Sequence, residues 1–255
     1  MQIPKKIHYC WFGDKDIPEK EQKCIETWKM FFPDYEIIKW SEDNFDYASC
    51  EYAKQAYDAR KFAFVSDYAR AKILFEEGGI YLDTDVEVLK TFPKVSAENG
   101  FMGFERRARL GTYVLGSVPG TDVMRELLDY YENNQFFLSE GVQDTIANVT
   151  ILTDIMTKRG LSLKGMKHQT VDGYEIFGRE AFYSTDDREK VPASSYAAHV
   201  FSNSWLTERE KKRGKNILWR KIARPLLRTA RKLSLKILGE EKTREKEIRL
   251  RNKLR

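Results

Sequence analysis

Two aspartates separated by one residue, Asp83 and Asp85, are the first candidates for chemistry in this sequence of 255 residues. They stand among apolar, β-forming residues directly after Gly78-Gly79. Carboxylates in such surroundings are costly unless a cation compensates their charge. Two oxygen ligands at the end of a strand suit Mg²⁺ or Mn²⁺, which can bridge protein carboxylates to the phosphates of a ligand. The pair therefore predicts a divalent-metal site.

A second pair with the same spacing, Asp14 and Asp16, indicates that spacing alone is not specific. It stands in a polar turn with Lys and Glu nearby, which favours an exposed loop. The surroundings, and not the spacing, therefore select Asp83 and Asp85 as the candidate site.

Residues 61–77, just before the glycines, form the strongest helix candidate. They are apolar on most faces, which predicts a buried helix that ends at Gly78-Gly79. Asp67 and Arg70 are charged exceptions, and a spacing of three residues brings both to one face of the helix. Charges on a buried helix need partners, so these two residues either pair with each other or face a ligand cleft together.

The surrounding sequence predicts the elements that must position these groups. A strand through residues 7–12, a helix from Pro18 to about Phe32 and a strand over residues 35–40 are expected in this order. Such a unit builds parallel sheets, which predicts the α/β class with a mostly parallel central sheet, whose ligand crevice lies beyond the strand ends. Further expected elements are a strand over residues 80–89 that the two aspartates interrupt, strands over 101–104, 112–115 and 171–177, and helices over 122–131 and 142–157.

Two runs carry a specific resemblance: Phe-Val-Ser-Asp-Tyr-Ala-Arg at residues 64–70 and Gly-Gly-Ile-Tyr-Leu-Asp-Thr-Asp at residues 78–85. Together they resemble the signature of glycosyltransferase family 32, and residues 3–13, His199 and Ser204-Trp205 are similar to it as well. That family includes bacterial capsular polysaccharide transferases, yeast mannosyltransferases and, more distantly, the glucosylating domains of large clostridial toxins. The resemblance implies a GT-A fold and metal-dependent sugar transfer from a nucleotide diphosphate with retention of anomeric configuration.

The resemblance also implies roles for single residues of this chain. The chemistry is assigned to Asp67, Arg70, Asp83 and Asp85. Donor binding is assigned to Trp11, Ser66, Asp67, Arg70, Tyr81, Asp83, Ser204 and Trp205. The predicted metal ligands, for Mn²⁺ or Mg²⁺, are Asp83, Asp85 and His199. These roles are physically reasonable, because an aromatic face binds a planar base and a buried acid and arginine offer an ordered acceptor and donor array for hydroxyls.

His199 departs from the family pattern in its surroundings. Many relatives read His-His-Trp-Ala-Gly-Ser-Trp, whereas this chain reads His-Val-Phe-Ser-Asn-Ser-Trp over residues 199–205. A neutral imidazole is a legitimate third ligand beside two carboxylates, but a single His in an apolar run also fits a hydrogen-bonded core residue. By composition alone, Trp11 likewise fits core packing, and the charged loop at residues 105–109 fits solvated surface.

The charge of the chain divides it near Trp205 into two predicted domains, a catalytic domain over residues 1–205 and a tail over residues 206–255. The tail holds 19 Lys and Arg against 6 Asp and Glu, whereas the remainder is acidic. Residues 209–238 predict an amphipathic helix with basic residues, an apolar stripe and Trp219, a pattern typical of helices that lie on an anionic membrane. The continuous apolar stripe favours lipid over nucleic acid, so no nucleic-acid partner is predicted.

The predicted function is hexose transfer from a nucleotide diphosphate sugar, UDP-galactose or UDP-glucose by the resemblance, to a lipid-linked oligosaccharide in bacterial capsular polysaccharide biosynthesis. No run of about 20 apolar residues and no secretory signal stands in the sequence, so a cytoplasmic protein peripheral to the inner face of the cell membrane is expected. A homo-oligomer is possible. The alternatives are a catalytically inactive nucleotide-sugar-binding protein at the membrane surface and, third, a basic-tailed nucleic-acid-binding protein.

Overall fold

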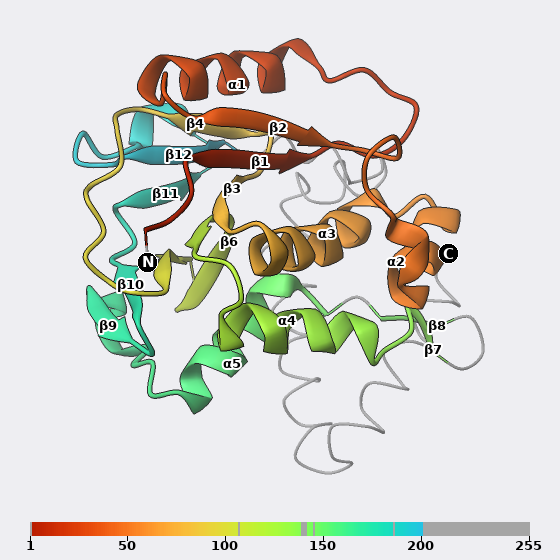
Figure 1. The fold of residues 1–255 in the computed structure, drawn as a ribbon. Coiled ribbons are helices and arrows are strands. Elements are labelled where there is room, and N and C mark those ends of the chain that lie inside the picture. The colour runs from red at the N-terminus through yellow and green to blue at the C-terminus, as the bar shows by residue number, and fades with distance from the viewer. Residues whose placement is uncertain (1, 107, 139–141, 145, 186, 201–255) are drawn as a thin grey trace, which may run out of the picture. The chain divides into compact units, whose positions relative to one another are not determined.

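A seven-stranded sheet lies at the centre of the computed structural model, which describes residues 2–106, 108–138, 142–144, 146–185 and 187–200 (Figure 1). Its strand order is β2 (Glu36–Trp40), β1 (Lys6–Cys10), β3 (Gly79–Leu82), β6 (Arg109–Ser117), β5 (Gly100–Glu105), β10 (Tyr174–Phe177) and β9 (Gln169–Val171). β1 pairs in parallel with β2 and β3, and β5 pairs in parallel with β10, whereas β6 and β9 run the other way. The predicted α/β class with a mostly parallel central sheet is confirmed.

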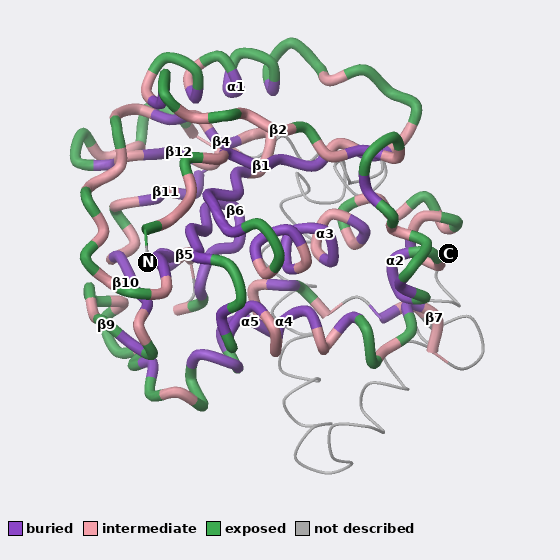
Figure 2. The backbone as a smooth tube through the Cα atoms, in the orientation of Figure 1, coloured by how far each residue is buried: buried purple, intermediate pink, exposed green. Residues whose placement is uncertain are grey.

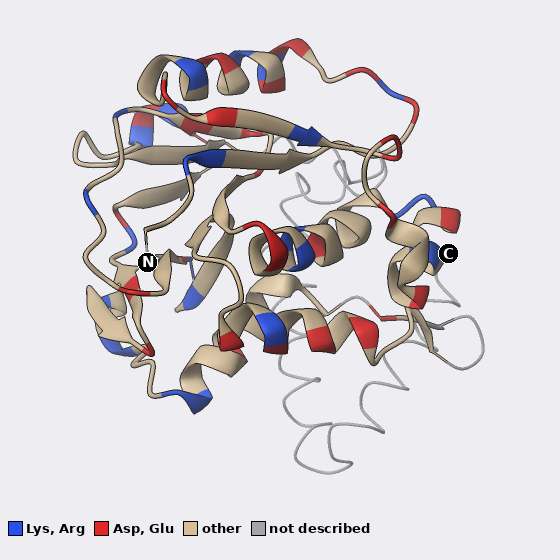
Figure 3. Ribbon diagram, viewed as in Figure 1, with Lys and Arg blue, Asp and Glu red and all other residues tan. Residues whose placement is uncertain are grey.

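Helices cover one face of this sheet, and their apolar residues form a core with it. They are α2 (Glu51–Asp58), α3 (Phe62–Glu76), α4 (Asp122–Glu132) and α5 (Asn148–Lys158). The other face packs against α1 (Glu19–Phe31) and a small sheet, which together enclose a second core. Figure 2 shows the strands between these layers as mostly buried, and Figure 3 shows acidic and basic residues alternating along α1 at the top of the view. The two cores explain why the strands are apolar on both faces.

The small sheet has the strand order β11 (Phe182–Thr185), β12 (Ala197–Val200) and β4 (Val86–Val88). β12 is parallel to β11 and antiparallel to β4. The predicted strand over residues 80–89 is therefore two strands in two sheets, because the chain turns between β3 and β4, where the Val86 N–H donates to the Asp83 carbonyl at 3.0 Å. The interruption expected at the aspartates is thus a crossing from one sheet to another.

Two other expectations differ from the structure, and several of its elements were not expected. The helix predicted over 142–157 begins at Asn148, because Val142–Gln143 is strand β8, paired with β7 (Phe137–Leu138). The strand predicted over 171–177 is a hairpin, whose turn at Asp172-Gly173 has positive φ angles of 49° and 71°. Asp-Gly is a strong turn signal that the apolar pattern concealed. Helix α2 and strands β11 and β12 were not expected, and short 3₁₀ turns lie at Tyr47–Ser49, Lys164–Met166 and Arg188–Lys190.

His8 connects β1 to the glycine turn that precedes β3. Its side chain is fully buried, and Nδ1 accepts a hydrogen bond from Trp40 Nε1 at 3.1 Å. Nε2 must then carry the proton, which it donates to the Gly78 carbonyl at 2.9 Å. The turn itself needs glycine, because Gly79 has a φ of 97° and a Cβ there would meet His8 Nε2 at 2.9 Å. His8 therefore has a structural role at this turn.

We expect His8 to make the stability of the protein depend on pH. Burial lowers the pKa of His8 from 6.5 to about 4, so below pH 6.5 the unfolded chain binds a proton that the folded chain does not. The free energy of unfolding should thus fall by about 3 kcal/mol between neutral pH and pH 4 through this group. Urea unfolding of His8→Gln, which can still donate to Gly78, should show a smaller decrease over that range. An unchanged pH dependence in this variant would contradict the expectation.

The predicted boundary between the two domains stays a prediction. The described residues of the predicted catalytic domain belong to one compact unit, Met1–Ser202. The tail over 206–255, with its amphipathic segment 209–238, lies outside the described residues.

Candidate active site

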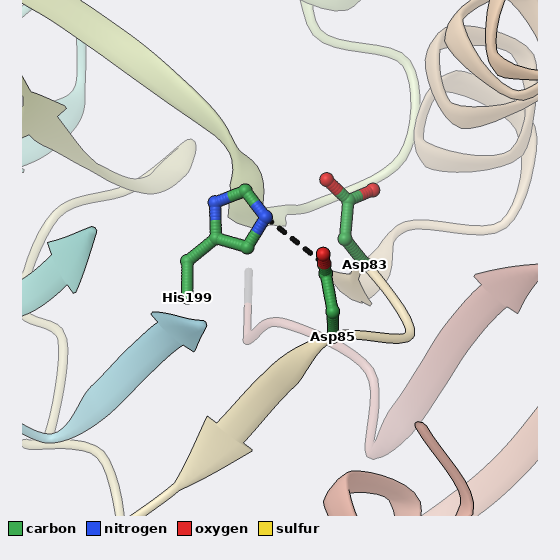
Figure 4. A group of neighbouring side chains, drawn as sticks. All are labelled: Asp83, Asp85 and His199. Carbon is green, nitrogen blue, oxygen red and sulfur yellow. Dashed lines mark ion pairs between the residues drawn. The ribbon is translucent and has the colours of Figure 1, made fainter. Parts of the chain in front are cut away.

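Asp83, Asp85 and His199 converge from three elements beside the carboxyl end of β3, an interior strand of the central sheet (Figure 4). Asp83 follows β3, Asp85 precedes β4, and His199 lies on β12 opposite Val86. Each offers one ligand atom, and these atoms all lie within 4.8 Å of one another. Figure 4 shows the imidazole of His199 directed at Asp85, with the Asp83 carboxylate beside them. The structure thus brings together the three residues that were predicted as metal ligands.

The spacing of these atoms suits a divalent cation. Ligand atoms of Mg²⁺ lie at about 2.1 Å from the ion, so neighbouring ligands are about 3 Å apart and opposite ligands about 4.2 Å. His199 Nε2 and Asp85 Oδ1 are 2.9 Å apart, and their side chains are 11% and 14% exposed. The Asp83 ligand atom lies no farther than 4.8 Å from the other two, close to the separation of opposite ligands. Two carboxylates and one imidazole therefore fit Mn²⁺ or Mg²⁺, and their role as ligands stays a prediction.

Arg70 lies between Asp67 and Asp83 and contacts both. Nη1 donates to Asp67 Oδ1 at 2.9 Å, and Nη2 donates to Asp83 Oδ1 at 2.6 Å. The arginine side chain is only 5% exposed, whereas that of Asp83 is 28% exposed. The contact uses one oxygen of Asp83 and leaves Oδ2 for a cation. The sequence left open whether Asp67 and Arg70 pair with each other or face a ligand cleft together. In the structure they pair directly, and Arg70 also bonds to Asp83.

Burial shapes the charges of this group. It raises the pKa of Asp67 from 3.8 to about 6, although the guanidinium of Arg70 acts in the opposite direction. Burial alone would lower the pKa of Arg70, but Asp83, Tyr81 and Asp67 together hold it well above its usual value. Arg70 thus stays charged, and it compensates two carboxylates that would otherwise repel each other at the site.

Tyr81 contacts Arg70, and Ser66 bonds to the backbone of its own helix. The Tyr81 ring is 1% exposed and lies beneath the guanidinium of Arg70, whose Cζ is 4.5 Å from the ring centroid. This cation–π contact favours the charged arginine and fixes its plane. Ser66 Oγ donates to the Phe62 carbonyl within helix α3 at 3.1 Å. A direct contact of either residue with a donor stays a prediction.

Trp11 follows the last residue of β1, at the same end of the parallel strands as Asp83. His8 pairs with Tyr81 in the parallel register of β1 and β3, so Cys10 is level with Asp83 and Trp11 lies just beyond. The indole is partly buried, belongs to neither apolar core among the described residues, and donates from Nε1 to the Lys15 carbonyl at 2.6 Å. This position does not favour core packing, and base stacking by Trp11 stays a prediction.

The remaining candidates from the sequence are Asp14, the charged loop at residues 105–109, and Ser204-Trp205. Asp14 is exposed and pairs with Arg60 at 3.0 Å, in agreement with the solvated loop expected there. In the charged loop, Glu105 and Arg109 are opposite residues in the register of β5 and β6, and Arg106 Nε donates to the Ser184 carbonyl at 3.0 Å. Ser204 and Trp205 lie outside the described residues.

Two residues near the site carried no signal in the sequence. Asn148, at the start of α5, is 3% exposed, and its Nδ2 donates to Tyr131 Oη at 2.7 Å and to the Asp67 carbonyl at 3.4 Å. Tyr113, on β6, packs its ring on His199 with 4.4 Å between centroids. Neither residue belongs to a motif, and only the packing of distant elements brings them to the site.

The comparison with known families supports the predicted resemblance. Residues 18–102 match the family described as glycosyltransferase sugar-binding region containing DXD motif. The match includes α3, β3 and both aspartates of the candidate metal site. Over these residues the chain is therefore similar to glycosyltransferase sugar-binding regions with a DXD motif, which confirms the predicted resemblance.

Individual relatives agree with this family. The chain is 34% identical to inositol phosphoceramide mannosyltransferase 3 of Schizosaccharomyces pombe over 97 residues, which cover 35% of this chain and 26% of the relative. It is 26% identical over 218 residues to an uncharacterized glycosyltransferase of Acanthamoeba polyphaga mimivirus, with coverage of 80% and 84%. Among solved structures, PaToxG glycosyltransferase matches with a TM-score of 0.49 and 22% identity, over 61% of this chain and 68% of that one. The chain spans only 20% to 34% of the length of three curated relatives, the mannosyltransferase among them.

Proposed function

We propose that this chain is a retaining, divalent-metal-dependent glycosyltransferase that moves a hexose from a nucleotide diphosphate sugar, UDP-galactose or UDP-glucose, to a glycan acceptor. The observation that carries the proposal is the convergence of Asp83, Asp85 and His199 within 4.8 Å, inside and beside the matched sugar-binding region. Their neighbour Arg70 connects this triad to Asp67 through two hydrogen bonds. An ion-pair network that only stabilises the fold would need Arg70, Asp67 and Asp83. It would not need the further carboxylate of Asp85 or the imidazole of His199 beside them.

The proposed chemistry is mainly electrostatic. A divalent cation held by Asp83, Asp85 and His199 would neutralise the charge that develops on the leaving nucleotide diphosphate. Asp67 and Arg70, fixed against each other at 2.9 Å, would hold sugar hydroxyls while the sugar gains oxocarbenium character. Trp11, beyond the end of β1, would stack on the base. No carboxylate is proposed as a covalent nucleophile, so the acceptor would attack on the face from which the diphosphate departs.

The proposal is tested by donor hydrolysis. We expect the full-length protein to hydrolyse at least one member of a panel of nucleotide diphosphate sugars when Mn²⁺ or Mg²⁺ is added, and to stop when EDTA is added in excess. The released nucleotide diphosphate is measured by chromatography, and thermal stabilisation by each donor is measured in parallel. Stabilisation by a donor without hydrolysis would indicate the inactive nucleotide-sugar-binding alternative. No response to any donor would contradict both functions.

We further propose that the acceptor is a lipid-linked oligosaccharide of bacterial capsular polysaccharide biosynthesis, reached from the inner face of the cell membrane. In the part of the chain that the structure describes, no helix combines the length and apolar character that a bilayer span requires. The basic tail, residues 206–255, would instead lie on the anionic surface, where each basic residue contributes about 1 kcal/mol.

Deletion of residues 209–255 is expected to release the protein from anionic vesicles. The full chain should sediment with vesicles that contain phosphatidylglycerol and much less with phosphatidylcholine vesicles, because the attraction is electrostatic. The truncated chain should stay in the supernatant with both vesicle types. If it sediments as the full chain does, the tail is not the membrane contact.

A further inference from the structure

Tyr113 lies where the central sheet and the small sheet meet beside the candidate metal site. Its backbone belongs to β6, next to β3, and its side chain is only 3% exposed. The Tyr113 carbonyl accepts a hydrogen bond from the Asp83 N–H at 3.0 Å. This bond holds the backbone of the first candidate ligand just after the last residue of β3. Tyr113 is therefore attached to Asp83 through the central sheet.

The hydroxyl of Tyr113 is bound to the small sheet. It donates to the Phe182 carbonyl on β11 at 2.5 Å. β11 pairs in parallel with β12, and Ser184 of β11 is opposite His199 of β12. The side chain thus spans from β6 to the strand beside the one that carries the imidazole. One residue connects the two sheets that supply the ligands.

The ring of Tyr113 also contacts the imidazole itself. The centroids of the Tyr113 and His199 rings are 4.4 Å apart, and the ring planes meet at 32°. Such a contact restricts rotation of the imidazole about χ2, the torsion that decides which ring nitrogen faces Asp85. In this orientation His199 Nε2 is 2.9 Å from Asp85 Oδ1. The backbone adds a further link, because the Val200 N–H donates to the Asp85 carbonyl at 3.0 Å.

We propose that Tyr113 is the positioning residue of the metal site: its ring, anchored to β11 through the hydroxyl, holds the His199 imidazole toward Asp85, while its carbonyl holds Asp83 at the required distance. The proposal rests on the proposed function, since it assumes that these three residues bind a divalent cation. A cation with near-octahedral geometry tolerates little displacement of its ligands. Residues that orient ligands without touching the metal change metal affinity by about 10-fold to 100-fold when they are removed.

The test is direct Mn²⁺ binding by the full-length protein without donor, measured from the electron paramagnetic resonance signal of free Mn²⁺. Tyr113→Leu removes the ring contact and the hydroxyl, and it should weaken Mn²⁺ binding about 10-fold to 100-fold. Tyr113→Phe keeps the ring but loses the bond to Phe182, and it should weaken binding by about threefold. Circular dichroism checks that each variant is folded.

Tyr174→Leu is the matched control. Tyr174 is a fully buried tyrosine of the same sheet, on β10, and its hydroxyl bonds to Ser117 and Thr121 and not to the candidate ligands. We expect this variant to lose stability while its Mn²⁺ affinity stays within about twofold of wild type. A parallel loss of Mn²⁺ affinity in Tyr174→Leu and Tyr113→Leu would overturn the positioning role.

The outcomes separate the two proposals. If the wild-type protein binds no Mn²⁺, the proposed function fails and the positioning role fails with it. Should wild type bind Mn²⁺ and Tyr113→Leu bind it equally well, only the role of Tyr113 is overturned. If Tyr113→Leu does not fold, Tyr113→Phe decides, and Mn²⁺ affinity equal to that of wild type in this variant would overturn the proposal.

Discussion

Replacement of Asp85 by Asn is expected to lower metal-dependent donor hydrolysis by at least about 10³-fold. The asparagine is nearly isosteric but lacks the negative charge that would hold a divalent cation beside His199, 2.9 Å away. The carboxylate of Asp85 is only 14% exposed, so few water molecules are available to replace it as a ligand. Because the side chain keeps its size, the midpoint of thermal unfolding should change by only a few degrees.

The second Asp-x-Asp of the chain supplies the control for this change. Asp16 stands two residues after Asp14 in an exposed loop and is not one of the candidate ligands, so Asp16→Asn removes the same charge from a pair with the same spacing. Initial rates at saturating donor and Mn²⁺ should be those of wild type in Asp16→Asn. If Asp85→Asn and the corresponding Asp83→Asn retained full activity, the site would be assigned to the wrong residues.

Replacement of Arg70 by Met is expected to lower the free energy of unfolding by about 3–5 kcal/mol and to abolish donor hydrolysis. Met has a similar length, so the change removes the charge and not the volume. Asp67 and Asp83 then lose the partner that bonds them at 2.9 Å and 2.6 Å, and two neighbouring carboxylates remain uncompensated. The Tyr81 ring also loses its cation.

The pH dependence of this loss has a definite sign. Burial raises the pKa of Asp67 from 3.8 to about 6 in the presence of Arg70, and loss of the guanidinium should raise it further. A folded-state pKa above the unfolded value means that the native protein gains stability as the pH falls toward 3.8. The cost of Arg70→Met should therefore be largest above pH 6 and smaller in acid.

Urea unfolding without added metal checks both parts of this expectation. Arg70→Met, Asp67→Asn and the double variant form a cycle, in which Asp67→Asn should restore part of the stability lost in Arg70→Met. A cost of less than 1 kcal/mol at neutral pH, or one that is independent of pH, would mean that solvent compensates the two carboxylates and that Arg70 is not their essential partner.

The local chemistry of the site could be predicted from the sequence because it is encoded in adjacent residues. The run from Gly78 to Asp85 has a glycine stop, apolar strand residues and two carboxylates in order. Asp67 and Arg70 lie three apart on one helix, so their proximity follows from helical geometry alone. The α/β class followed from the alternation of strand and helix in the first 40 residues, which leaves few topologies for a parallel sheet.

Other features could not be predicted in this way, because they depend on pairings between distant residues. Nothing local indicates that the chain changes sheets between β3 and β4, since apolar β-formers stand on both sides of the aspartates. The hydrogen bond from the Asp83 N–H to the Tyr113 carbonyl ends the pairing of β3, and the antiparallel register of β12 with β4 brings His199 beside Asp85. Asp85 and His199 are more than 100 residues apart in the sequence, so no local pattern could indicate that they lie together.

The sequence by itself determined which residues carry charge in apolar surroundings and which elements hold them, because helix spacing, turn chemistry and the cost of a buried charge act over a few residues. Only the tertiary structure decided that Arg70 bonds Asp83 as well as Asp67, and that Tyr113 joins two sheets behind His199. These contacts exist because the two apolar cores, on opposite faces of the central sheet, fix the position of the small sheet against β3 and β6.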